Sequence, residues 1–387
     1  MNIVFFTHPE FLGSQSMPRY ANWLAKGMEN RGHNVQVWAP KPKFFNIAFI
    51  KGLKKWHGYI DQYIVFPNWV EKQLKMAETD TLYVFSDHAL GPWVPLVKDR
   101  RHVIHCHDFL AQRSALGEVP QNMTGKTGRV YQSFIRRGYK LGKNFISISN
   151  KTALELHRFL GYVPKVSEVV YNGLLHDYSP STDVKATRKE LYDETGINLT
   201  NGYLLHVGGN QWYKNRVGVI KIYDAWRKKS VEKFPLLMVG AVPSVALKAA
   251  YDESEYSEDI YFLTGKDDSF VYKAYTGASV FLFPSLAEGF GWPIAEAMAS
   301  GIPVITTGEA PMNEVGGSVA YYIRVMPQDN EGIKEWANES ADVIKTVFST
   351  DEVQAQQIIA AGLAYTRNFD SDAALDKIET IYKRLLQ

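Results

Sequence analysis

Two glutamates, Glu288 and Glu296, carry the clearest chemical signal in this chain because they flank a glycine-rich turn. Residues 288–298 read Glu-Gly-Phe-Gly-Trp-Pro-Ile-Ala-Glu-Ala-Met. The apolar, aromatic run at 278–283 before them is typical of a buried strand. Pro293 suits the first turn of a helix, where its missing N–H is tolerated. The sequence therefore predicts Glu288 on the loop after a strand and Glu296 in the first turn of the next helix.

The residue types at this turn narrow the ligand. Backbone N–H groups at a helix N-terminus bind phosphate, and Gly289 and Gly291 let a ligand approach the backbone closely. Two carboxylates accept hydrogen bonds from hydroxyl groups, and the helix dipole favours the ionised form of Glu296. The spacing alone also fits a helix-start carboxylate and a solvated loop residue. The whole string favours a ligand with both phosphates and vicinal hydroxyls, as in a nucleotide sugar.

A second glycine-rich turn lies earlier in the chain. Residues 208–215 read Gly-Gly-Asn-Gln-Trp-Tyr-Lys-Asn, after a strand-like run and before a helical one. Gly208 and Gly209 would admit a diphosphate, and Lys214 could neutralise charge that develops on it as a bond to a sugar breaks. Alone, the segment also fits an ordinary turn with a surface lysine. Together with the two glutamates, it favours a donor-binding site.

Length and composition set the broad class. The chain has 387 residues, 45% of them hydrophobic and 22% charged, which predicts two globular domains. The apolar runs are too short to span a bilayer, and residues 1–7 resemble a first strand rather than a signal peptide. Cys106 is the one cysteine, which excludes an intrachain disulfide and fits a reducing compartment. We therefore expect a cytoplasmic protein.

The net charge of +2 hides an asymmetry between the two halves. Residues 1–170 contain 23 Lys and Arg against 12 Asp and Glu, whereas the remainder contains 20 against 29. Such a split indicates two domains with different partners. A basic half would also suit nucleic acid, but no recognised nucleic-acid motif accompanies it.

Strand-like and helix-like runs alternate along the chain, and the pattern restarts in the second half. This alternation predicts parallel sheets covered by helices. Two such sheets with a seam near residues 172–173 predict two lobes and a cleft, with ligands bound beyond the carboxyl ends of the strands. We expect helices at 18–31, 217–226 and 373–386, and strands at 2–7, 35–39, 82–85, 103–106, 145–149, 166–171, 203–207, 236–239, 260–263, 280–283, 303–305 and 320–323.

With these motifs in place, the chain resembles the retaining, nucleotide-sugar-dependent glycosyltransferases of family 4. The resemblance runs from the first strand to about residue 317, and its second-half motifs are the more specific. It implies an α/β fold of the GT-B type, with two Rossmann-like lobes facing a central cleft and a C-terminal helix returning to the N-terminal lobe. The implied domains are an acceptor lobe at 1–173, a donor lobe at 174–368 and a terminal helix at 369–387.

The resemblance also implies roles for single residues. Glu288 would contact the hydroxyls of the transferred sugar, Glu296 the ribose hydroxyls and Lys214 the phosphates. The backbone around Phe290 and Gly291 would lie near sugar and phosphate. Where the family usually has a phosphate-binding arginine, this chain has Gly209. Phosphate binding would then rest on Lys214, on helix N-termini, or on Arg216 as a displaced substitute.

The first half adds looser matches. The run His105-Cys106-His107-Asp108 consists of metal-ligand types, but strand alternation sends the two histidines to one side and Cys106 to the other. We therefore expect no metal. The resemblance implies that this run faces the acceptor, with His107 close to the transferred sugar, while Asp108 lies on the acceptor side. Gly13 and Ser14 match the loop where acceptor and diphosphate approach, and structural histidines remain the alternative reading of the run.

Two basic stretches raise the question of a membrane. Residues 41–56 mix five lysines with seven large apolar side chains, and residues 126–143 form a second basic stretch. These stretches fit peripheral contact with an anionic membrane, and equally an acceptor-side loop and a packed helix with solvated charges.

Together these observations predict a retaining, metal-independent transfer of a sugar from a UDP- or GDP-sugar to a hydroxyl of a glycan or lipid-linked acceptor, as in cell-surface polysaccharide or glycoconjugate synthesis. The nucleotide sugar is a co-substrate, and no cofactor is expected. His107, Glu288 and Lys214 are the expected catalytic residues. The alternatives are a sugar-nucleotide epimerase on the same architecture and a catalytically silent subunit that binds glycan or nucleotide.

Overall fold

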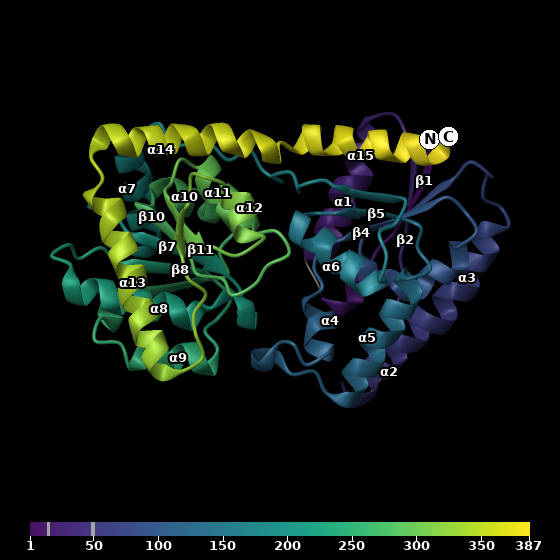
Figure 1. The fold of residues 1–387 in the computed structure, drawn as a ribbon, viewed down its shortest axis with the longest axis horizontal. Coiled ribbons are helices and arrows are strands. Elements are labelled where there is room, and N and C mark those ends of the chain that lie inside the picture. The colour runs from purple at the N-terminus through teal and green to yellow at the C-terminus, as the bar shows by residue number, and fades with distance from the viewer. Residues whose placement is uncertain (14–15, 48–50) are drawn as a thin grey trace. The chain divides into compact units, whose positions relative to one another are not determined.

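The computed structural model describes residues 1–13, 16–47 and 51–387 and divides into two compact units. The first consists of Met1–Gly173 and Ser371–Gln387, and the second of Leu174–Asp370. In the described part of the chain, each unit contains a six-stranded sheet in which every pairing is parallel. Helices cover both sheets (Figure 1). The expected α/β class with two Rossmann-like units is confirmed.

The sheet of the first unit has the order β2-β1-β3-β4-β5-β6, so the direction of winding reverses beside β1. Its strands are β1 (Asn2–Phe6), β2 (Asn34–Trp38), β3 (Leu82–Phe85), β4 (His102–Cys106), β5 (Asn144–Ser147) and β6 (Val166–Val169). Its helices are α1 (Ser16–Asn30), α2 (Lys51–Ile60), α3 (Phe66–Leu74), α4 (Leu110–Ala115), α5 (Lys126–Tyr139), α6 (Asn150–Leu160) and α15 (Ser371–Leu386), with short turns η1 (Glu10–Leu12), η2 (Phe45–Ile47), η3 (Asp61–Val65), η4 (His88–Val97) and η5 (Pro120–Asn122).

The sheet of the second unit has the order β12-β11-β10-β7-β8-β9, which reverses between β7 and β10. Its strands are β7 (Leu204–Gly208), β8 (Leu236–Gly240), β9 (Ile260–Thr264), β10 (Val280–Phe283), β11 (Val304–Thr307) and β12 (Tyr321–Ile323). Its helices are α7 (Val184–Thr195), α8 (Arg216–Lys229), α9 (Val245–Asp252), α10 (Asp268–Gly277), α11 (Trp292–Ala299), α12 (Met312–Gly316), α13 (Asn330–Ser349) and α14 (Glu352–Tyr365), with η6 (Trp212–Lys214), η7 (Ser257–Asp259) and η8 (Thr366–Phe369).

The terminal helix α15 packs on the first unit beside α1 (Figure 1). Trp23 Nε1 donates to Ser371 Oγ at 2.7 Å, and Arg31 forms an ion pair with Asp376 at 2.7 Å. The Tyr382 hydroxyl lies 2.7 Å from His105 Nε2 in the buried interior. The expected return of the C-terminal helix is therefore confirmed. The helical run from α2 to α3 was not anticipated from the sequence.

The close approach of η4 and α5 holds the first core together. A Cβ on Gly138 would lie 2.0 Å from the Gly91 carbonyl oxygen, and a Cβ on Gly91 would lie 2.3 Å from the Ile135 carbonyl oxygen. Because both obstacles are backbone atoms, neither can give way without moving a whole element.

We therefore expect Gly138→Ala to lower the free energy of unfolding by about 3 kcal/mol, although alanine has the better helix propensity. The measurement is urea-induced unfolding followed by tryptophan fluorescence. Gly125→Ala, at the N-cap of the same helix with no atom near its Cβ position, is the matched control and should change it by less than about 0.5 kcal/mol. Equal stabilities of the two variants would contradict this account of the packing.

Candidate active site

The turns after β7 and β10 meet at the point where the strand order of the second sheet reverses. In parallel sheets, such a reversal leaves a crevice beyond the carboxyl ends of the two strands, where ligands bind. Lys214 follows β7 and Glu288 follows β10, so both expected residues lie at this position. The Lys214 Nζ donates to Glu288 Oε1 at 2.8 Å, and only 14% and 8% of the two side chains are exposed.

The surrounding residues fix this ion pair. Ser285 Oγ also donates to Glu288 Oε1 at 2.7 Å, and the Lys214 ammonium lies 4.9 Å from the centre of the Phe283 ring. The Tyr213 carbonyl accepts from the Leu286 N–H at 2.7 Å, which ties η6 to the loop after β10. The pair is therefore a built element of the site rather than a chance contact of two surface charges.

Asn215 connects the lysine turn to helix α8. Its backbone is left-handed, with a φ of 50°, and its side chain caps α8 by accepting from the Gly218 N–H at 3.2 Å. The same side chain donates to the Pro284 carbonyl at 3.0 Å. Asparagine tolerates this left-handed conformation better than most residues. Asn215 therefore ends the turn, caps the helix and joins the two loops.

The two expected glycines lie where β7 ends. Gly240, the last residue of β8, has a φ of 143°, and a Cβ there would lie 2.1 Å from the Gly208 carbonyl oxygen. A Cβ on Gly208 would lie 3.0 Å from His206 Nε2, and one on Gly209 would lie 2.6 Å from Gln211 Oε1. Packing therefore favours glycine at Gly208 and Gly240, whereas at Gly209 only the flexible end of the Gln211 side chain would have to move.

Arg216 is buried beneath this turn. Its Nη1 donates to Asn210 Oδ1 at 2.6 Å and to the Ala241 carbonyl at 2.8 Å, so it links the turns that follow β7 and β8. Burial lowers its pKa to about 10, and its Nε and Nη2 are buried without a partner among the described residues. Because these nitrogens are covered by protein, Arg216 serves here as a link between loops.

Glu296 lies in the second turn of α11, since that helix begins at Trp292. The expectation that it occupies the first turn was wrong, so it lies farther from the helix N-terminus, and from the positive end of the dipole, than the sequence indicated. Burial instead raises the pKa of Glu296. Its Oε2 accepts from the Tyr275 hydroxyl at 2.9 Å, and the Tyr178 hydroxyl also hydrogen-bonds to the carboxyl group. Sequence reasoning missed both tyrosines.

The loop between the glutamates places a glycine on each side of a buried phenylalanine. Phe290 is buried and packs edge-on against Phe369, with ring centres 5.5 Å apart. Gly291 has a φ of 110° immediately before α11, and its carbonyl accepts from the Ile294 N–H at 3.0 Å. With Phe290 in the core, Gly289 is half-buried and Gly291 is buried, and neither has a Cβ at the start of the helix.

The remaining expected residues lie in the first unit. His107 is buried, its Nε2 donates to the Ser86 carbonyl at 2.8 Å, and burial lowers its pKa, which favours the neutral ring. Asp108 accepts from the Leu110 N–H at 3.0 Å at the start of α4. Gly13 ends η1 with a φ of 73°. Ser14 lies outside the described residues.

Cys106 lies in the hydrophobic core of this unit, while His105 and His107 both pack against Tyr20, as strand alternation predicts. His105 has a tyrosine hydroxyl at each ring nitrogen, from Tyr20 at 2.9 Å and Tyr382 at 2.7 Å. This histidine is therefore structural. Across the described ranges, no three His, Cys, Asp or Glu side chains converge as a metal-binding group.

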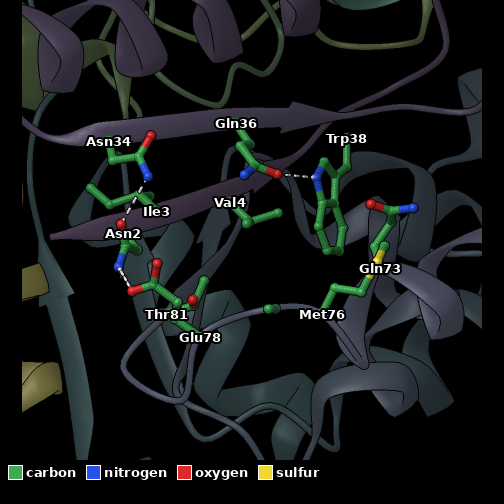
Figure 2. Close-up of a pocket in the computed structure, with 11 residues that line it drawn as sticks. Asn2, Ile3, Val4, Asn34, Gln36, Trp38, Gln73, Met76, Glu78 and Thr81 are labelled. Atoms are coloured by element: carbon green, nitrogen blue, oxygen red, sulfur yellow. Dashed lines mark hydrogen bonds between the residues drawn. The ribbon is translucent and has the colours of Figure 1, made fainter.

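A groove of about 1480 Å³ lies beyond the carboxyl ends of β1 and β2. Lys41, Lys43 and Arg19 line it together with Trp38, Phe66 and Trp69. A smaller pocket of about 160 Å³ shares Gln36, Trp38 and Gln73 with it and is bordered by Asn2 and Asn34, which hydrogen-bond at 2.9 Å (Figure 2). These aromatic residues could not be recognised as groove-lining from the sequence, because each is a single apolar residue within a strand or helix.

Two Rossmann-like units, each with a six-stranded parallel sheet, are the architecture of the GT-B glycosyltransferases. The model of glycosyltransferase family 4 matches residues 17–177, and that of glycosyl transferases group 1 matches residues 187–317. The chain therefore belongs to the family 4 glycosyltransferases.

Related proteins include the lipopolysaccharide glucosyltransferase WaaG of Escherichia coli K12, which is 22% identical over 73% of this chain and 74% of its own length. The O-antigen chain mannosyltransferase B of Escherichia coli is 26% identical over 48% of this chain, a match that spans about half (46%) of that protein. The crystal structure of WaaG superposes with a TM-score of 0.70 at 17% identity, covering 98% of this chain and 99% of the other. Anabaena Alr3699/HepE in complex with UDP-glucose gives 0.71 at 17%, covering 99% and 100%. At these identities the structures show the shared fold.

The buried pair predicts a strong energetic coupling. We expect Lys214→Met to lower the free energy of unfolding by about 3 kcal/mol, because the substitution leaves the buried Glu288 carboxylate without its counterion. Adding Glu288→Gln should restore part of the loss, giving a coupling of about 1–3 kcal/mol in a double-mutant cycle measured by urea unfolding.

The exposed pair of Lys248 and Asp252 on α9 is the matched control. The cycle of Lys248→Met and Asp252→Asn should give a coupling of about 0.3–0.5 kcal/mol. A coupling at Lys214 and Glu288 no larger than this would show that the first pair is not held as described.

Proposed function

We propose that this protein transfers a sugar from a UDP- or GDP-sugar to a hydroxyl of a glycan or lipid-linked acceptor, with the anomeric configuration retained. The buried pair of Lys214 and Glu288 at the strand reversal of the second sheet is the observation that carries this proposal. The names of the relatives, a lipopolysaccharide glucosyltransferase and an O-antigen chain mannosyltransferase, support a role in cell-surface polysaccharide synthesis.

The proposed donor contacts follow from the chemistry of each group. Lys214 exchanges Glu288 for the diphosphate, which carries more negative charge, and neutralises the charge that grows there as the sugar departs. Glu288, released from the lysine, accepts hydrogen bonds from the sugar hydroxyls. Glu296 accepts from the ribose hydroxyls, and backbone N–H groups at the start of α11 and in the turn at Gly208 and Gly209 hold phosphate. Crystals of Anabaena Alr3699/HepE with UDP-glucose support a nucleotide-sugar donor by analogy.

The proposed roles in the first unit are those of acceptor and sugar contacts. A neutral His107 that donates through Nε2 to Ser86 has Nδ1 as an acceptor for a sugar hydroxyl. Asp108 and Ser14 are proposed on the acceptor side, and Gly13 is proposed to contact the donor, where its lack of a side chain lets the diphosphate approach the backbone. The reaction needs no metal in this proposal, because Lys214 and helix N-termini supply the positive charge that the leaving diphosphate requires.

Two alternatives make different predictions for the same substrates. An epimerase changes the donor sugar without an acceptor, and a silent binding subunit neither transfers nor hydrolyses it. Thermal-shift screening against UDP-, GDP- and other nucleotide sugars identifies the donor, because selective binding stabilises the fold by mass action. Incubation of that donor with and without acceptor glycans then separates transfer from epimerisation.

We expect Glu288→Gln and Lys214→Met each to lower kcat by at least about 100-fold, since each removes a charge that acts on the reacting sugar or its leaving group. Release of the nucleoside diphosphate measures this rate, and proton NMR of the product reports the anomeric configuration. Glu309→Gln, in the exposed loop after β11, is a control for charge removal and should keep wild-type kcat. Near-normal transfer by Glu288→Gln would refute the proposal.

We also propose that the first unit contacts an anionic membrane, because the structure joins the two basic stretches into one surface, here called the aromatic face. Rings of Trp56, Tyr59, Tyr63, Tyr131 and Phe134 pack in sequence across α2, η3 and α5, with neighbouring centres 5.6–5.8 Å apart for the pairs Trp56–Tyr59, Tyr59–Tyr131 and Tyr63–Phe134. The two helices lie side by side (Figure 1). Trp56 is 60% exposed and Val130 is 72% exposed.

The exposed charges of the two stretches that form the aromatic face have one sign, and Asp61 of η3 is buried, where it accepts from the Phe44 and Phe45 N–H groups. No Asp or Glu occurs at residues 30–60 or 119–154, whereas Lys54, Lys55, Lys126, Arg129 and Arg137 are exposed there. Exposed indole and phenyl rings beside lysine and arginine are typical of a membrane interface. The inner side of α5 packs in the core through Ile135 and Tyr139, so a packed helix and a membrane surface are compatible. Residues 48–50 of the first stretch lie outside the described residues.

We expect co-sedimentation with vesicles of phosphatidylglycerol and phosphatidylcholine but not with phosphatidylcholine alone. The triple variant Lys54→Glu, Lys55→Glu, Trp56→Ser should reduce binding by about tenfold or more, given about 1 kcal/mol for each charge removed near the surface. Lys334→Glu with Lys345→Glu on α13 is the matched control and should bind like the wild type. Equal binding of the two variants would refute the membrane contact.

A further inference from the structure

The carboxyl group of Glu296 receives hydroxyl groups from two different parts of the second unit. Tyr275, in α10, donates to Oε2 at 2.9 Å and is fully buried. Tyr178 reaches the same carboxyl group from the irregular segment that begins the unit at Leu174. A carboxylate has about four lone-pair positions. The two phenols therefore fix its orientation while leaving it able to accept further hydrogen bonds.

The segment that carries Tyr178 is anchored to α10. The Tyr272 hydroxyl donates to the Ser179 carbonyl at 3.1 Å, and the ring of Tyr178 lies 6.1 Å from that of Tyr272 and 5.9 Å from that of Tyr275. The Tyr178 N–H closes a tight turn onto the His176 carbonyl at 3.0 Å, and His176 lies 3.7 Å from Asp268 at the start of α10. These contacts hold the Tyr178 hydroxyl at a defined place beside Glu296.

We propose that Tyr178 is a positioning and specificity-determining residue for the nucleoside: its hydroxyl orients Glu296 toward the vicinal hydroxyls of ribose. This inference rests on the proposed function and adds to it a residue that neither glutamate motif contains. An unsupported glutamate side chain would have to lose rotamer freedom when ribose binds. A carboxylate already held by two phenols binds the ribose hydroxyls without that entropy loss. Removal of one ribose hydroxyl, as in a deoxynucleotide, then costs the full binding free energy of its hydrogen bond.

The same contact has a pH signature. Burial raises the pKa of Glu296, whereas the hydrogen bonds from Tyr275 and Tyr178 and the charges of Lys214 and His176 lower it. Ribose hydroxyls donate to the ionised carboxylate, so binding weakens as pH falls through this pKa. Removal of the Tyr178 hydroxyl takes away one lowering contribution. The acid limb of nucleotide binding should therefore move to higher pH.

The test is calorimetric titration of the full-length protein with UDP and 2′-deoxy-UDP, and with GDP and 2′-deoxy-GDP, between pH 5 and 8 (about the range in which buried carboxyl groups titrate). The wild type should bind one ribonucleotide about tenfold or more tightly than its deoxy form, as expected for a hydrogen bond to a charged group. Tyr178→Phe should lower this ratio by about threefold or more and move the acid limb upward. Tyr272→Phe removes a neighbouring hydroxyl that bonds Ser179 instead, and should keep both wild-type properties.

The outcomes separate this inference from the proposed function. If the wild type binds neither UDP nor GDP, the proposed function fails and the inference fails with it. If a ribonucleotide binds and Tyr178→Phe keeps the wild-type ratio and acid limb, the inference alone is refuted. An equal loss in Tyr272→Phe would also refute it, because the effect would then come from the anchoring of the segment. Thermal unfolding of both variants confirms that each is folded.

Discussion

A lysine and a carboxylate withdrawn from water must neutralise each other, and much of the second unit is arranged to meet this requirement. The strand reversal between β7 and β10 brings the turns of Lys214 and Glu288 together. Asn215 then joins the two loops through its left-handed backbone and its hydrogen bond to the Pro284 carbonyl. The Ser285 hydroxyl donates a further hydrogen bond to the Glu288 carboxylate. Under the proposed function, a diphosphate would be a stronger counterion for Lys214 than one carboxylate is, and its binding would release Glu288 to contact the sugar.

Burial pushes several neighbouring groups toward their neutral forms. In the second unit it lowers the pKa of His206 to about 3, lowers that of Arg216, and raises that of Glu296. Lys214 and Glu288 form a buried ion pair instead. Neutral polar groups beside one charged pair suit the binding of a ligand with hydroxyl groups. Neutral rings and phenols orient hydroxyl groups without competing for phosphate. The charge asymmetry of the chain, basic up to residue 170 and acidic after it, extends over whole units, whereas these pKa shifts arise from contacts of single residues.

Local sequence signals account for most of the fold and for the centre of the site. Short apolar runs predicted strands such as β4 and β10, and glycines predicted the turns that follow β7 and β10. Both signals are local, because a buried strand and a tight turn each restrict the types of consecutive residues. The depth of Glu296 could not be predicted in this way. Tyr178 lies more than a hundred residues before it, and a single tyrosine in an irregular segment gives no periodic signal. The burial that raises the pKa of Glu296 is likewise set by tertiary packing, so adjacent residues do not reveal it.

The position of α15 governs how the first unit is completed during synthesis. Leu375 packs over Gly27, and Tyr382 reaches His105 inside the first unit, yet the whole second unit is translated between these partners. At ribosomal speeds of about 5–20 residues per second, those nearly two hundred residues take roughly 10–40 s. The second unit can fold during that interval. During that time the surface of the first unit around Trp23, Gly27 and His105 stays uncovered, because α15, which packs on it, has not yet been synthesised.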